Sequence, residues 1–169
     1  MKTLKSMKRL ILLSAIGLAV TSPLKAAPLQ AALDKYIQIQ TALAGDSVKG
    51  VPEAAAEIAS IAKASDGAVP VAAQAGALAK TTDIKAAREA FKPLSAALIT
   101  AFSNQKSVSG QYYEAFCPMA KASWIQVGKK IANPYFGADM SGCGEIRKPL
   151  GGSSQANAAA SGGMGCCGS

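Results

Sequence analysis

The chain has 169 residues, half of them hydrophobic, with 18 basic and 10 acidic side chains and no histidine. Without histidine, catalytic sites built on Ser–His or Cys–His pairs are excluded, and the commonest ligand for zinc and copper(II) is missing. Any polar chemistry must depend on sulfur, carboxylates or backbone groups. Because no Cys-x-x-Cys pair is present either, we do not expect an enzyme.

The first 26 residues have the three parts of a secretory signal peptide. They begin with a basic stretch from Lys2 to Arg9, continue with a charge-free apolar run over 10–20, and end in a segment with small and turn-forming residues up to Ala26. The apolar run would span about 16 Å as a helix, which is too short for a bilayer core of about 30 Å. We therefore expect cleavage after Ala26 and a soluble periplasmic protein with no membrane span.

Removing this segment changes the charge of the chain. Residues 1–26 carry five basic and no acidic side chains, so 13 basic and 10 acidic side chains remain, a net charge of +3. That excess is small and evenly spread. No nucleic-acid partner is expected.

Apolar residues recur at helical spacing in four segments, at about 29–43, 52–64, 70–80 and 84–102. The fourth is the clearest, because its apolar residues follow one another at intervals of 3, 4, 3, 4 and 4 from Ile84. Thr82 or Asp83 can cap its start, and Pro93 is expected to kink it. The apolar stripes are expected to form a core rather than a groove for a partner helix.

These segments predict a mostly α fold, an up-and-down helical bundle with a short C-terminal loop or strand cap. The predicted domain covers 27–148, with the cap at 111–148, and a flexible tail rich in Gly, Ser and Ala follows at 149–169. The cap holds six of the nine aromatic residues. It is expected to have a short extended stretch, a loop with Trp124 and a turn at Asn133-Pro134. Its aromatic side chains are expected to pack the cap onto the bundle, although Trp124 could also cover a metal ion.

Four sulfur-containing residues lie in the cap. If the chain stays extended after Cys117, the side chains of Cys117 and Met119 point the same way, and Met140 and Cys143 share one face of a helical turn. Two thiolates and two thioethers form a soft ligand set, which favours Cu(I) or Ag(I) over hard cations. The sequence therefore predicts a soft-metal site at Cys117, Met119, Met140 and Cys143.

A structural disulfide is the alternative interpretation. Two cysteines in an oxidising compartment commonly form a disulfide, so Cys117 and Cys143 could staple a domain that binds no metal, with the methionines as core filler. Cys166 and Cys167, at the end of the tail, form either a second, weaker metal site or a reactive thiol pair.

The cap resembles a known family. The motifs that carry the resemblance are C-P-M at 117–119, A-S-W at 122–124, N-P-Y-F-G at 133–137, Met140, and C-G at 143–144. They resemble those of small exported bacterial proteins of unknown function. The same domain is also found at the C-terminal end of periplasmic adaptor subunits of copper/silver efflux pumps.

The resemblance is specific over 111–146 and extends to 29–106 in helical layout only. It implies periplasmic handling of Cu(I) or Ag(I), with copper/silver efflux components as possible partners. Family members often have histidine where this chain has Phe116, and a longer loop between the methionine and the tryptophan. A site in this chain would therefore consist of sulfur alone.

Overall fold

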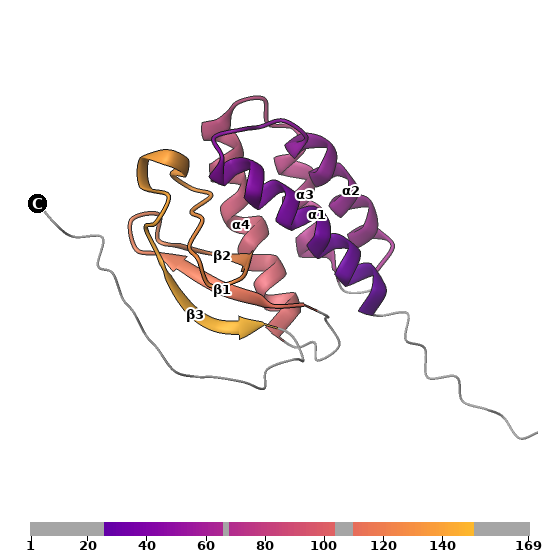
Figure 1. Ribbon diagram of the computed structural model, residues 1–169. Helices are drawn as coiled ribbons and strands as arrows, with labels where there is room; N and C mark the ends of the chain where they lie inside the picture. Colours follow the sequence, from indigo (N-terminus) through magenta and orange to yellow (C-terminus); the bar gives the residue numbers. More distant parts are fainter. Residues whose placement is uncertain (1–25, 66–67, 104–109, 151–169) are drawn as a thin grey trace, which may run out of the picture.

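The computed structural model describes residues 26–65, 68–103 and 110–150. The predicted signal peptide and the tail with Cys166 and Cys167 lie outside these residues, apart from their inner ends. Four helices come first in the chain, followed by a small sheet (Figure 1). The helices are α1 (Ala26–Ala44), α2 (Val51–Lys63), α3 (Val69–Leu78) and α4 (Ile84–Ser103).

The predicted helical stripes form the hydrophobic core. In each helix most residues at the predicted spacing are buried, for example Leu33 in α1, Ile58 in α2 and Leu78 in α3, whereas Ile84 at the start of α4 is partly buried. Consecutive helices pack against each other in chain order. The Asp83 carboxylate accepts a hydrogen bond from the backbone N–H of Ala86 at 2.9 Å, which confirms the predicted cap of α4. Helix α4 continues through Pro93 as one element.

The C-terminal part is more ordered than the predicted loop or strand cap. It forms an antiparallel sheet with strand order β2-β1-β3. The strands are β1 (Tyr112–Cys117), β2 (Ala122–Val127) and β3 (Glu145–Leu150). Trp124 therefore lies in a strand, not in a loop as expected. A short 3₁₀ helix, η2 (Gly137–Met140), lies in the connection between β2 and β3.

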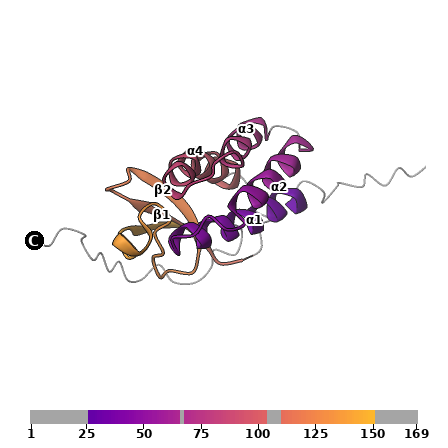
Figure 2. The ribbon, with the colours of Figure 1, turned by 90° about the horizontal axis from the view of Figure 1, so that it is seen from above.

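The helices cover the edge of β2 that does not pair with β1 (Figures 1 and 2). The Tyr36 hydroxyl, on α1, accepts a hydrogen bond from the backbone N–H of Ile125 at 3.1 Å. The Tyr135 hydroxyl donates to the carbonyl of Ser123 at 2.5 Å. These two phenols satisfy backbone groups that an edge strand would otherwise leave exposed. The Tyr36 bond fixes β2 to the bundle, and the Tyr135 bond fixes the β2–β3 connection to β2.

No helix among the described residues is both long enough and apolar enough to cross a membrane.

Candidate functional site

Two of the four predicted site residues meet in the interior. Cys117 is the last residue of β1, and Cys143 lies two residues before β3. The antiparallel pairing of these strands aligns Phe116 with Glu145 and so brings the two cysteines together. Their Sγ atoms are 3.4 Å apart, both side chains are buried, and no disulfide bond joins them.

The backbone also contributes to the sulfur pair. The β1–β2 connection is a tight turn in which the N–H of Lys121 donates to the carbonyl of Pro118 at 3.3 Å. In the same turn the N–H of Ala120 donates to the Sγ of Cys117 at 3.4 Å. The turn that follows β1 is therefore hydrogen-bonded to the sulfur of Cys117.

Met119 lies in this turn, so the extended geometry from Cys117 to Met119 that would align the two side chains is not found. Strand β1 ends at Cys117, and residues 118–121 turn back toward β2. In a strand, side chains two positions apart point to the same face, but this alternation ends with β1 and does not extend from Cys117 to Met119. Met119 is 59% exposed, whereas Cys117 is fully buried.

Met140 lies closer to the interior. It ends η2 and is half-buried against the hydrophobic core. The N–H of Cys143 donates to the carbonyl of Met140 at 3.0 Å, so the two residues belong to one turn, as predicted. The structure thus has two turns that each carry one buried cysteine and one more exposed methionine.

Asn133 holds the turn that contains Cys143, and sequence reasoning identified it only as part of a turn. Its fully buried side chain donates from Nδ2 to the carbonyl of Cys143 at 2.7 Å. Its Oδ1 accepts a hydrogen bond from the N–H of Tyr135 at 2.8 Å. A buried amide with both ends bonded has little freedom to move, so it fixes the backbone position of Cys143.

Trp124 and Tyr135 form the aromatic surroundings of the site. Their rings meet edge to face with centroids 5.8 Å apart, and both side chains are buried. Tyr135 also packs against Phe91 of α4, with ring centroids 6.1 Å apart, so the aromatic residues join the sheet to the bundle as expected. Burial raises the pKa of the Tyr135 phenol well above its usual range. The phenol therefore stays neutral.

Gly144 brings the backbone next to Cys143 close to Trp124. Gly144 has a φ of 146°, and a Cβ atom there would lie 2.7 Å from Cη2 of Trp124 and 3.0 Å from the carbonyl oxygen of Phe116. Only glycine allows so close an approach. The indole of Trp124 therefore lies beside the backbone that carries Cys143.

A polar cluster fixes the loop at 134–138 to the ends of α1 and α4. Arg88 donates from Nε to the carbonyl of Pro134 at 3.0 Å and from Nη2 to Oδ1 of Asp46 at 2.5 Å. Asp46 accepts a second bond, from the N–H of Ala138 to Oδ2, at 2.9 Å. The Ala138 hydrogen bond and the Arg88 guanidinium together lower the pKa of Asp46.

The lowered pKa of Asp46 predicts a pH-dependent contribution to stability. Because the folded state favours the carboxylate, the contribution is present above the unfolded pKa of about 3.9 and is lost as the pH falls through the lower folded value. Asp46→Asn should lower the melting temperature at neutral pH, and the difference from wild type should vanish under strong acid. Asparagine tolerates the positive φ of 55° at this position, so backbone strain does not contribute.

Thermal unfolding followed by circular dichroism across the acid range tests this prediction. Asp139→Asn, which changes an exposed carboxylate of η2, serves as the control. A difference in melting temperature between wild type and Asp46→Asn that stays constant with pH would contradict the role of the charge.

The described residues contain no group of three or more His, Cys, Asp and Glu side chains that could hold a metal ion. A metal bound at the cysteine pair would need other ligands, and Met140, which is half-buried in the same turn as Cys143, carries a further sulfur. Because such a donor set is all sulfur, it suits a soft, monovalent, low-coordinate ion.

Comparison with known proteins gives one match. A family model described as "Protein of unknown function (DUF3347)" matches residues 32–110. No curated protein and no solved structure matches. The chain is thus similar to this family over its four helices, and the matched span ends before β1 and the cysteine pair.

Proposed function

We propose that this protein binds a Cu(I) or Ag(I) ion at Cys117 and Cys143, with the thioether of Met140 as a third ligand. The observation that carries the proposal is the buried sulfur pair, whose Sγ atoms are 3.4 Å apart. Thiolate–metal bonds of about 2.3 Å place the two sulfurs of a trigonal site about 4.0 Å apart. The pair needs to open only slightly to hold an ion and a third ligand.

The surroundings of the pair suit Cu(I) better than a divalent ion. Zinc normally takes four ligands in a tetrahedral site, and two thiols do not meet that need. Two thiolates around a monovalent ion leave a single negative charge, which the Ala120 N–H can partly compensate. Trp124 and Tyr135 exclude water from this region and would protect a bound Cu(I) from oxidation.

The expected export and the family resemblance suggest where the protein acts. A signal-like segment at 1–26 would take the chain to the periplasm, and the cap motifs resemble those found on copper/silver efflux adaptors. We infer storage of the ion or its delivery to efflux components. The function is binding rather than catalysis.

The second candidate function is a structural domain stapled by a Cys117–Cys143 disulfide. The same short distance favours it, because two sulfurs 3.4 Å apart need to approach only a little to form an S–S bond of about 2.05 Å. Two features favour the metal: the backbone hydrogen bond to Cys117 Sγ, and a methionine on each cysteine-bearing turn.

A titration under anaerobic, reducing conditions separates the two functions. The full chain is used with Cys166→Ser and Cys167→Ser, so that Cys117 and Cys143 are its only thiols. We expect one Cu(I) or Ag(I) per chain, bound in competition with a chromophoric chelator. Trp124 is the only tryptophan and lies beside Cys143, so its fluorescence should be quenched in step with binding.

The number of reactive thiols in the protein as isolated without reductant tests the alternative, a structural disulfide. Two reactive thiols, or a bound ion that protects them, would support the metal function. A complete disulfide, together with no stoichiometric uptake after reduction, would overturn it in favour of the structural domain.

A further inference from the structure

The sulfur pair is closed to solvent. Cys117 is 0% exposed and Cys143 is 4% exposed, and the indole of Trp124, at 0%, lies against the backbone next to Cys143. A hydrated ion cannot reach either thiol directly. If the proposed function is right, the ion must pass through ligands nearer the surface.

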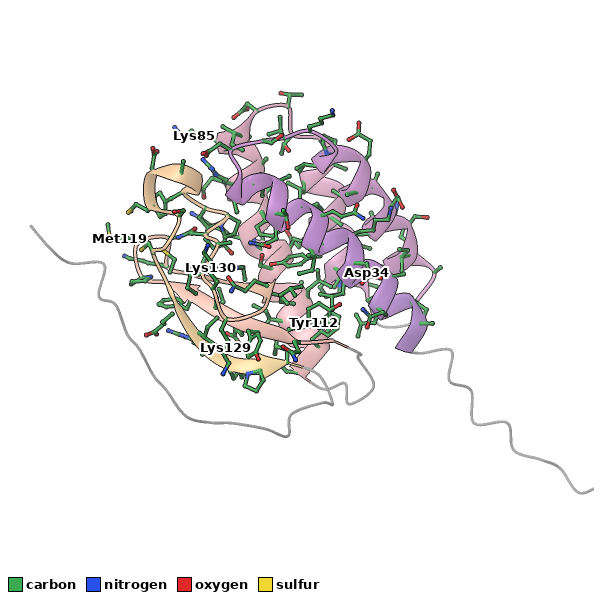
Figure 3. The ribbon with its side chains drawn as sticks, in the orientation of Figure 1. Asp34, Lys85, Tyr112, Met119, Lys129 and Lys130 are labelled. Carbon is green, nitrogen blue, oxygen red and sulfur yellow. The ribbon has the colours of Figure 1, made fainter. Side chains whose placement is uncertain are left out.

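Met119 is placed to be such a ligand. It stands two residues beyond Cys117 in the β1–β2 turn, and its side chain is 59% exposed. Figure 3 shows Met119 at the edge of the molecule, on the opposite side of the view from Asp34 of α1. The Ala120 N–H bond to Cys117 Sγ ties this turn to the buried thiol, so movement of the turn would uncover that thiol first.

Thioether chemistry suits a first contact. Methionine sulfur binds soft ions weakly and has no proton to lose, so it can bind an ion while both thiols are still protonated. Transfer inward then forms bonds from the ion to Cys117 and Cys143, breaks its bond to Met119, and releases two thiol protons to solvent. No oxidation or reduction is involved.

We propose that Met119 is an exchange ligand through which the soft ion enters and leaves the buried site, and that it is not part of the final complex. This inference rests on the proposed function. It assigns different roles to the two methionines: Met140 contributes to affinity, whereas Met119 sets the rate of exchange. An exchange ligand that is present only during transfer changes the association and dissociation rates together and leaves the affinity unchanged.

Stopped-flow fluorescence of Trp124 with Ag(I) tests this inference in the Cys166→Ser/Cys167→Ser full chain. Met119→Leu should slow association and dissociation each by about tenfold, with an unchanged Kd. Met140→Leu should raise the dissociation rate and the Kd. Val127→Ser, which changes another side chain that is 59% exposed, is the control and should match the parent.

A replacement ligand makes the test more specific. In Met119→His a neutral imidazole is a metal ligand, but it is protonated below a pKa of about 6.5. This variant should exchange Ag(I) at nearly the parent rate at mildly alkaline pH and as slowly as Met119→Leu under mild acid. A purely structural role for Met119 would give no such pH-dependent rescue.

The outcomes separate the two proposals. If the parent takes up no Ag(I), the proposed function fails, and this inference fails with it. If the parent binds Ag(I) and Met119→Leu exchanges at the parent rate, only the exchange role is overturned. If Met119→Leu weakens the Kd as much as Met140→Leu does, Met119 belongs to the final complex.

Discussion

Replacing Cys117 or Cys143 by serine is expected to weaken Cu(I) binding by more than about a hundredfold, because loss of outer hydrogen-bonding partners alone costs metal sites about 10- to 100-fold. Each variant leaves one thiolate, and the serine hydroxyl is a hard, weakly acidic ligand. The two variants should be equally defective, since neither thiol can hold the ion alone. Competition with a Cu(I) chelator in the Cys166→Ser/Cys167→Ser background measures the effect.

The pH dependence of the Cu(I) affinity provides an independent test of the same ligands. Binding requires both thiols to lose a proton, so the affinity of the parent for Cu(I) should fall as the pH falls, and more steeply than in either single variant. Undiminished affinity in either serine variant would contradict a site built on the pair. If the disulfide interpretation holds instead, reducing the parent should cost about 2–4 kcal/mol of stability.

The helices could be predicted from the sequence because their signal is local. Apolar residues recur every three or four positions, and breakers such as Gly45 separate the runs. The predicted start of α4 at Ile84 and its cap at Asp83 agree with the structure. These features depend on interactions between residues only a few positions apart.

The sheet was harder to predict, because its pairing is not local. Strand β1 lies in the centre and shows no clean alternation of buried and exposed residues. Strand β3 lies at the edge, and its side chains are mostly exposed, so it resembles a polar loop in sequence. Phe116 pairs with Glu145, 29 positions along the chain, and no local pattern indicates that partner.

Only part of the candidate site could be predicted, because some of its contacts are also not local. The soft character of sulfur singled out the two cysteines, and the structure brings them together. The expected alignment of Met119 with Cys117 is not found, because the strand ends at Cys117, two residues before Met119. The residues that support the site, Asn133 and Arg88, bond to backbone carbonyls 10 and 46 positions away, which composition and spacing do not reveal.

The two glycines that flank Cys143 offer a matched pair of variants. A Cβ at Gly144 would lie 2.7 Å from the Trp124 ring, whereas a Cβ at Gly142 would meet nothing within 4 Å. Gly144→Ala also forces a side chain onto a backbone with a φ of 146°. Strain of this kind costs about 1–3 kcal/mol, and overpacking costs about as much again.

Gly144→Ala is therefore expected to destabilise the protein by about 2–6 kcal/mol, and Gly142→Ala by less than about 0.5 kcal/mol. Urea unfolding followed by circular dichroism measures both differences. Because the alanine at 144 displaces Trp124 or the backbone beside Cys143, Gly144→Ala should also weaken Cu(I) binding in protein that remains folded. Equal stability of the two variants would show that the close approach at Gly144 does not fix the site. A loss of stability in Gly144→Ala with unchanged Cu(I) affinity would show that the indole supports the fold without positioning Cys143.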